Sequence, residues 1–298
     1  MSANAAFRCS VASAELAEPL AGTASTVRAF LLVECPGPWG VDAVRDSRLP
    51  AEVKALLTDL EKHHRVRPLL VRHHGGGPVG SARVFAAYVH TPHPWVETAE
   101  LDDVRDLLGL DLTGLGSGGS PGLTPYGEPL FLVCTHGKHD ACCAERGRPV
   151  CAAMHAVSPT HTWEVSHIGG DRFAGNVLVL PQGLYYGRLG PEDAAGLATR
   201  HLAGELDLEH LRGRSSYPFS VQAAEVFLRR HTGEHGLNTL ELVDHTRQGA
   251  ETSAVFAVGR QRWSVRVHTE LQARRQLTCR AVTGGIGQAH TLVEVAPA

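Results

Sequence analysis

Residues 129–143 read P-L-F-L-V-C-T-H-G-K-H-D-A-C-C, and this stretch decides how the chain folds and what chemistry it carries. The apolar run at 129–133 predicts a buried strand, and the ten residues after it contain three thiols and two imidazoles. A strand that ends in such a loop places sulfur and nitrogen ligands at a sheet edge, where proteins hold metal ions and iron–sulfur clusters. A second loop, S-H-I-G-G-D at residues 166–171, follows another short apolar segment. We expect the two loops to form one metal site.

The residues around these loops predict alternating strands and helices. Downstream of the first loop, the pattern predicts in turn a helix at 149–157, a strand at 162–166, strands at 176–180 and 184–188, and a helix at 191–202. Pro149 suits the first turn of the first of these helices. Upstream, the pattern predicts a strand at 29–34, a helix at 51–61, strands at 67–72 and 83–89, and a helix at 101–108. The order strand–helix–strand–strand–helix therefore occurs twice.

This repeated order predicts an α/β fold with two tandem thioredoxin-like domains, at residues 1–125 and 126–212, followed by a C-terminal α+β extension at residues 213–298. The Gly-, Pro- and Ser-rich segment 114–127 is the expected linker between the two domains. In the extension we expect an amphipathic helix and a β-ribbon, at residues 221–230, 253–258 and 263–268. The sequence does not indicate what the extension does.

Composition narrows the class of protein. The chain has 298 residues, 43% of them hydrophobic, and a formal net charge of -3, which argues against a nucleic-acid or membrane-surface partner. It has no apolar run long enough to span a bilayer, and residues 1–10 do not resemble a secretory signal. We therefore expect a cytoplasmic protein, whose clustered thiols indicate metal or redox chemistry. The scattered cysteines are interpreted as buried packing residues: Cys9, Cys35, Cys151 and Cys279.

A [2Fe-2S] cluster needs four protein ligands, and imidazoles can replace two thiolates on one iron. Cys134 and either Cys142 or Cys143 can supply the thiolates, and His167 can supply an imidazole. Asp171 would then be the fourth ligand, which is an uncommon role for a carboxylate. The alternative is a tetrahedral zinc site, for which the first loop alone contains enough ligands: Cys134, His136, His139, Cys142 and Cys143.

Two longer strings carry a resemblance to a known family. They are C-T-H-G-K-H-D-A-C-C-A at residues 134–144 and W-E-V-S-H-I-G-G-D-R-F-A-G-N-V-L-V-L-P-Q-G-L-Y-Y-G at residues 163–187. Together they resemble the sucrase/ferredoxin-like family, and the resemblance extends over about residues 7–202. It implies thioredoxin-like ferredoxin architecture. It also implies a [2Fe-2S] cluster held by two cysteines of the first loop and a His-x3-His pair of the second.

Carried over position by position, the resemblance places Cys134 and His167 at the first thiolate and the first imidazole. Cys143 matches the second thiolate, because it directly precedes the small residue Ala144. The second imidazole falls on Asp171, where this sequence departs from the family pattern. The carboxylate could bind iron, the cluster could be labile or absent, or another ligand could substitute: His136, His139 or Cys142. We expect a bound cluster, because both loops are otherwise intact.

These observations favour an electron-transfer protein that exchanges single electrons with a reductase and an acceptor, and that has no substrate of its own. The alternative from a different class is a zinc-stabilised two-domain binding module. A thiol redox enzyme that uses Cys142 or Cys143 as its nucleophile is a third possibility. Sugar hydrolysis, which the family name suggests, is not supported, because no pair of carboxylates outside the metal loops is marked for it.

Overall fold

The computed structural model describes residues 7–76, 81–90 and 92–298. Residues 1–6, which begin the segment considered above as a secretory signal, lie outside the described residues. Within these ranges no helix combines the length and the apolar character needed to cross a membrane.

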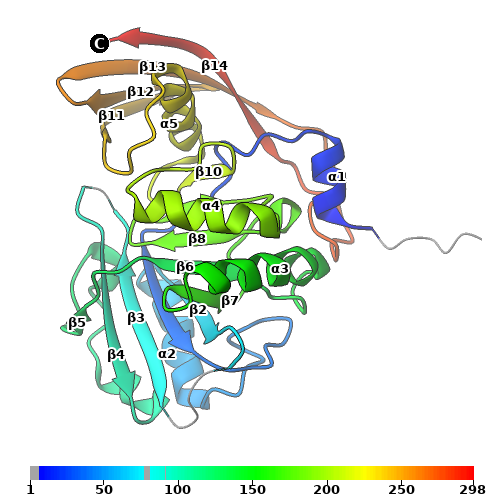
Figure 1. Ribbon diagram of the computed structural model, residues 1–298, viewed down its shortest axis with the longest axis vertical. Coiled ribbons are helices and arrows are strands. Elements are labelled where there is room, and N and C mark those ends of the chain that lie inside the picture. The colour runs from blue at the N-terminus through cyan, green and yellow to red at the C-terminus, as the bar shows by residue number, and fades with distance from the viewer. Residues whose placement is uncertain (1–6, 77–80, 91) are drawn as a thin grey trace, which may run out of the picture.

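A ten-stranded mixed sheet forms the centre of the molecule (Figure 1), with the strand order β10-β9-β8-β6-β7-β2-β1-β3-β4-β5. The central strands β1 and β6 are buried along their whole length, as expected for uninterrupted apolar runs. The strands are β1 (Ala29–Glu34), β2 (Val66–His73), β3 (Ala82–Tyr88), β4 (Trp95–Leu101), β5 (Thr124–Pro125), β6 (Leu130–Cys134), β7 (Thr162–Val165), β8 (Val177–Leu180), β9 (Leu184–Tyr186) and β10 (Leu211–Arg214).

The two halves of this sheet have the same internal order. In the first half, β1 is parallel to β2 and antiparallel to β3, which is antiparallel to β4. In the second half, β6 is parallel to β7 and antiparallel to β8, which is antiparallel to β9. Antiparallel pairing of β2 with β7 joins the halves into one sheet. The α/β class predicted from the sequence is confirmed.

Three apolar cores lie against this sheet. On β6, Phe131 and Val133 pack with the helices α3 (Ala141–Val157) and α4 (Pro191–Leu202), while Leu132 and Cys134 point to the opposite face. That opposite-face core also holds residues of β1, so it is shared between the halves. The third core packs the other face of β1 against α2 (Ala51–His63).

The C-terminal region is a separate four-stranded antiparallel sheet with a helix packed against it. Its elements are α5 (Phe219–Thr232), β11 (Leu240–Gln248), β12 (Glu251–Val258), β13 (Gln261–Leu271) and β14 (Gln288–Pro297). α5 also contacts β10, at the edge of the central sheet. The loop that joins β13 to β14, residues 272–287, turns back and lies beside the N-terminal helix α1 (Cys9–Glu15) (Figure 1). The predicted helix and β-ribbon of this region are confirmed.

Three sequence predictions differ from the structure. The helix predicted at 149–157 begins at Ala141, because the Asp140 side chain caps it and Pro149 lies inside it. The helix predicted at 101–108 is the end of β4 followed by the 3₁₀ helix η1 (Val104–Gly109). The predicted linker at 114–127 contains the short helix η2 (Leu115–Ser117) and the edge strand β5. Proline is common in the first turn of a helix, but Pro149 lies eight residues after the first residue of α3.

Candidate metal centre

Two cysteines meet where β6 passes into α3. Cys134 is the last residue of β6, and Cys143 lies in the first turn of α3. α3 can approach the end of β6 closely because Gly147 faces the strand: a Cβ at that position would lie 2.0 Å from the carbonyl oxygen of Cys134. Asp140 fixes the start of the helix, since its Oδ1 accepts the N–H of Cys142 at 2.9 Å. The local sequence therefore places both thiols on one side of the strand end.

The second loop reaches the same place because β7 runs parallel to β6, with Val165 paired to Cys134. The carboxyl ends of parallel neighbours meet at one sheet edge. Gly169 and Gly170 have φ values of 99° and 78°, and this left-handed backbone turns the chain so that the 3₁₀ helix η3 (Asp171–Phe173) begins beside His167.

The fully buried Arg212 holds this second loop in place through hydrogen bonds. The Arg212 guanidinium donates to the carbonyl oxygen of Gly169 at 3.0 Å, to Asn176 Oδ1 at 2.8 Å and to Thr23 Oγ1 at 3.1 Å. It also lies over the ring of Phe173. Arg212 belongs to no motif that the sequence made visible, so its role could not be predicted.

We call Cys134, Cys143, His167 and Asp171 the inner site. The ligand atoms of Cys134, Cys143 and His167 all lie within 4.8 Å of one another. Asp171 Oδ1 lies 3.1 Å from Cys143 Sγ and 2.9 Å from His167 Nδ1. The second contact has ion-pair distance but not hydrogen-bond geometry, so the buried Nδ1 has no hydrogen-bond partner. Both thiols are buried, and the side chain of Asp171 is 3% exposed.

In the inner site the side-chain pKa values favour a negative charge on Cys134 and a positive charge on His167 before any metal binds. A hydrogen bond between the two thiols, aided by His167 and opposed by burial, lowers the pKa of Cys134. The same hydrogen bond, together with burial, raises the pKa of Cys143. Burial alone would lower the pKa of His167, but Asp171 and Cys134 raise it to about 9. The site therefore combines a thiolate with an imidazolium, and binding a metal through all its ligands must release protons.

Of the other candidate ligands of the first loop, His136 and Cys142 are engaged elsewhere, whereas His139 lies beside the inner site and its ligand atom is within 4.8 Å of those of His167 and Asp171. His136 donates from Nε2 to the carbonyl oxygen of Gly40 and accepts the N–H of His167 at Nδ1, so both of its ring nitrogens are used. The ring of His139 stacks on that of His167 at 3.7 Å, and its Nε2 lies 3.8 Å from Asp171 Oδ2. Cys142 turns away from the inner site. Which of these residues bind a metal stays a prediction.

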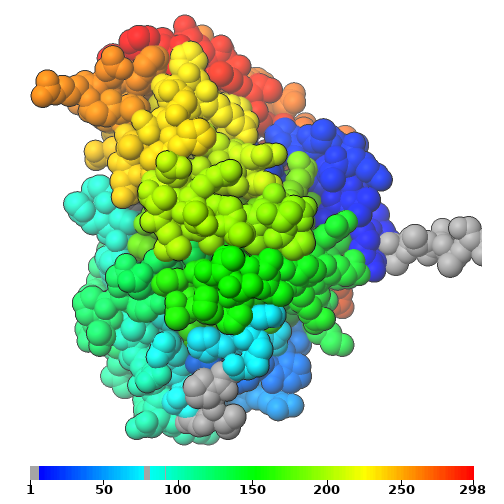
Figure 2. Space-filling view, viewed as in Figure 1, coloured from blue at the N-terminus to red at the C-terminus, as the bar shows by residue number. Residues whose placement is uncertain are grey.

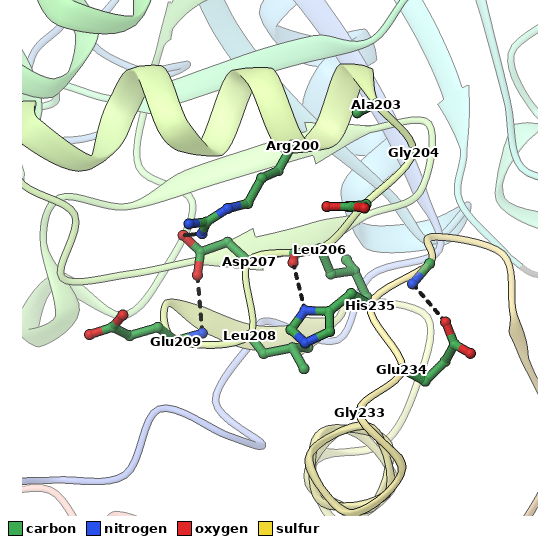
Figure 3. Close-up of a pocket in the computed structure, with 12 residues that line it drawn as sticks. Arg200, Ala203, Gly204, Leu206, Asp207, Leu208, Glu209, Gly233, Glu234 and His235 are labelled. Carbon is green, nitrogen blue, oxygen red and sulfur yellow. Dashed lines mark hydrogen bonds and ion pairs between the residues drawn. The ribbon is translucent and has the colours of Figure 1, made fainter.

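The inner site reaches the surface on its imidazole side. His136, His139 and His167 line an open cavity of about 640 Å³, together with Arg45, Lys62 and Arg67. A larger groove of about 850 Å³ lies elsewhere, between the end of α4 and the segment after α5 (Figure 3). Its polar side chains bond to their immediate surroundings: Asp207 pairs with Arg200, and Glu234 accepts the N–H of Gly236. The cavity beside the histidines is therefore the one that bears on metal chemistry.

Both the sequence and the fold are similar to those of known proteins. The sequence profile of the sucrase/ferredoxin-like family matches residues 20–213. Altered inheritance of mitochondria protein 32 of Meyerozyma guilliermondii is 32% identical over 80 residues, which cover 24% of this chain and 28% of that protein. The protein of the same name from Debaryomyces hansenii is 33% identical over 89 residues, 26% of this chain and 32% of its own length. The chain thus spans less than a third of each of these relatives.

Among solved structures, the chain is similar to the thioredoxin-like [2Fe-2S] ferredoxin from Aquifex aeolicus. The similarity covers 30% of this chain and 94% of the ferredoxin chain, with 21% identity and a TM-score of 0.26. The Cys55Ser variant of that ferredoxin is 22% identical over 28% of this chain and 97% of its own, with a TM-score of 0.25.

Proposed function

This chain belongs to the sucrase/ferredoxin-like family, and on that premise we propose that it is an electron-transfer protein that holds a [2Fe-2S] cluster at the inner site. One observation carries the proposal. Two buried thiols and an imidazole from two neighbouring loops bring their ligand atoms within 4.8 Å of one another. This arrangement supports a ferredoxin-like metal-binding group, which is the type of site that the two sequence motifs predict.

The donor set fits such a cluster in kind. Iron–sulfur clusters take thiolates from cysteine and, in some centres, imidazoles on one iron. Cys134 and Cys143 would supply the thiolates, and His167 and Asp171 would supply the other two ligands. The buried Nδ1 of His167 lies at ion-pair distance, 2.9 Å, from Asp171 Oδ1, so these two side chains sit together beside the thiols. When bound, the cluster supplies a one-electron redox couple.

The chain's own residues would then control how far water reaches the cluster and where its ligands lie. Cys134 and Cys143 are each 1% exposed, so water is excluded on the thiolate side. His167 keeps 23% of its side chain exposed and makes the contact with the outside. Arg212 holds the loop that carries His167 and Asp171 through the carbonyl of Gly169. Exposure and hydrogen bonding around the ligands are the properties by which a protein sets a cluster's potential.

The finer architecture is also part of this proposal. The matching strand order of the two halves supports two thioredoxin-like units, and all four residues of the inner site belong to the second. Boundaries at residues 1–125, 126–212 and 213–298 stay predictions.

We further propose that redox partners approach the cavity beside the histidines. Three basic residues line it, Arg45, Lys62 and Arg67, beside two acidic ones, Asp42 and Glu61, and this small excess of positive charge suits an acidic docking surface on a reductase or an acceptor.

The redox state of the thiols bears on the compartment. All seven cysteines are free thiols, which fits a reducing compartment such as the cytoplasm.

Anaerobic purification of the full chain tests the cluster. We expect iron and acid-labile sulfide in equal amounts, visible charge-transfer absorption, and an electron paramagnetic resonance signal after reduction. Cys134→Ser should lose all three while remaining folded, and Cys35→Ser, which removes a buried thiol of another core, should keep them. A colourless protein that has zinc at the inner site instead would support the zinc-stabilised binding module.

A pair of variants tests the fourth ligand. Asp171→Ala and Asp171→His should each change the resonance signal, because one removes a ligand and the other installs an imidazole. Unchanged spectra in both variants would remove Asp171 from the ligand set.

A further inference from the structure

A second group of potential ligands lies on the other side of the first turn of α3. We call Cys9, Asp140, Cys142 and Cys279 the outer cluster. Their ligand atoms all lie within 4.8 Å of one another, although they come from α1, the start of α3 and the loop between β13 and β14. Figure 2 shows the N-terminal segment, in blue, packed between the C-terminal sheet and α3. Cys9 and Cys279, interpreted above as unrelated packing residues, are therefore neighbours of Cys142.

We propose that the outer cluster is a second metal site, which binds one Zn²⁺ ion through three thiolates and the Asp140 carboxylate. Cys142 Sγ lies 3.4 Å from Cys279 Sγ, which lies 3.6 Å from Cys9 Sγ. Tetrahedral zinc with Zn–S bonds of about 2.3 Å places its sulfur ligands about 3.8 Å apart. Two of the three sulfur pairs thus already have nearly the separation that a single tetrahedral ion requires, and the third pair lies within 4.8 Å.

Asp140 is positioned as a ligand rather than as a free surface acid. It is 1% exposed, and its two oxygens accept the N–H of Cys142 at 2.9 Å and the N–H of Cys279 at 2.6 Å. Both oxygens also lie 3.7 Å from Cys9 Sγ. A carboxylate has about four lone-pair sites, so two backbone hydrogen bonds fix its orientation and leave capacity for a metal.

The ligand set selects the ion. Three thiolates favour zinc over magnesium or calcium, which prefer oxygen ligands. Four ligands, of which Cys9, Asp140 and Cys142 are buried, describe the closed coordination of a structural zinc site. A disulfide is a poorer account of the same residues, because it would join two of the thiols and leave the third beside a buried carboxylate.

A zinc ion here would connect distant parts of the chain. It would tie the N-terminal helix and the C-terminal loop to the helix that carries Cys143. It would also occupy Cys142, so that the adjacent cysteines of α3 each serve a different site. Structural zinc contributes folding free energy directly, so its removal should loosen both terminal segments.

The experiment uses a variant that lacks the inner thiols, so that metal bound at the inner site cannot be mistaken for metal bound at the outer cluster. The full chain with Cys134→Ser and Cys143→Ser is incubated with ZnCl₂ under reducing conditions and desalted. We expect one zinc per chain, and on exchange with CoCl₂ the thiolate charge-transfer and d–d absorption of tetrahedral cobalt. Adding Cys279→Ser should lower the zinc content at least tenfold, whereas adding Cys35→Ser should leave it at one.

Cys279 is the ligand of choice for the variant because it lies in a loop and is partly exposed, so its replacement by serine should not prevent folding. Cys9→Ser provides a second removal from a different element. Full zinc content after Cys279→Ser and after Cys9→Ser overturns the proposal. So does a chain that takes up no zinc while its thiols are reduced, or one whose peptide map shows a Cys142–Cys279 disulfide in place of the metal.

Discussion

The inner site and the outer cluster share one turn of helix but are assembled in different ways. The inner ligands lie between residues 134 and 171, on loops that follow two adjacent parallel strands. The outer ligands lie between residues 9 and 279 and meet only when both ends of the chain have packed against α3. The inner site is therefore a product of local topology, and the outer cluster is a product of the completed tertiary fold. Variants that affect one without the other test this difference.

The largest effect is expected for Gly147→Ala, which should abolish both sites together. The added methyl group would lie 2.0 Å from the carbonyl oxygen of Cys134, and neither backbone can move without separating α3 from β6. We expect the free energy of unfolding to fall by about 3 kcal/mol, at the upper end for overpacking. Metal analysis should find less than a tenth of the wild-type iron and zinc.

Gly196→Ala is the matched control, because a Cβ at that helical position meets nothing within 4 Å. It should raise stability by about 1 kcal/mol, the ordinary gain of alanine over glycine inside a helix. A stable Gly147→Ala protein that retains both metals would contradict the close approach of α3 to β6.

Arg212→Met should separate the two sites. The substitution leaves the half-buried carbonyl of Gly169 and the buried Oδ1 of Asn176 without their donor, which we expect to cost about 3 kcal/mol. The loop with His167 and Asp171 should lose its position, so iron content should fall by more than half while zinc content stays at one. Arg260→Met, at an exposed turn, should change stability by less than about 0.5 kcal/mol. Loss of zinc together with iron would argue against independent sites.

Much of the inner site could be predicted because its information is local. The apolar runs mark β1 and β6 to within one residue, α4 begins at Pro191 as predicted, and the two motif loops directly follow the strands that position them. The start of α3 could not be predicted because it depends on how the Asp140 side chain caps the helix in three dimensions. The sequence pattern instead favours Pro149 as a first-turn residue.

The outer cluster could not be predicted because no spacing rule relates Cys9 and Cys279 to Cys142. Single cysteines at such distances are most often packing residues, and Cys35 and Cys151 are indeed parts of apolar cores. Only the packing of α1 and the loop between β13 and β14 brings the three thiols together. Arg212 could not be predicted for the same reason, since its partners come from two segments distant from it in the sequence, at Thr23 and in the connection between β7 and β8.

Glu18→Gln should show how far the two sites are coupled. Glu18 is buried and pairs with Arg172, next to Asp171, at 2.8 Å and with Arg275, in the loop that carries Cys279, at 3.0 Å. Breaking a buried pair that links both regions should cost about 2 kcal/mol at pH 7, less than a fully buried pair because both arginines are partly exposed. Metal content should not change, but zinc should be released severalfold faster to a chelator.

The same variant has a defined pH dependence. Burial alone would raise the pKa of Glu18, but Arg172, Ser13 and Arg275 lower it below its ordinary value of 4.5. A carboxyl with a lowered pKa contributes stability above that ordinary value and loses the contribution as the pH falls through the folded-state pKa. The stability difference between the wild type and Glu18→Gln should thus be full at pH 7 and shrink below pH 4.5 in urea denaturation. Exposed Glu15→Gln should show no such difference, and a constant difference for Glu18 would exclude the ion pairs as its source.

The smallest effect is expected at the open side of the inner site. His139 is about one-third exposed and stacks on His167, so His139→Gln should cost less than about 1 kcal/mol. Because the ring covers the ligand nearest the solvent, its removal should accelerate loss of iron to a chelator by two- to fivefold. The outer cluster faces away from this ring, and its zinc should be released at the wild-type rate. Exposed His93→Gln controls for the loss of an imidazole. Equal acceleration of zinc and iron loss would mean that solvent reaches both sites by one route, and the distinction between a locally built site and one closed by the chain ends would no longer hold.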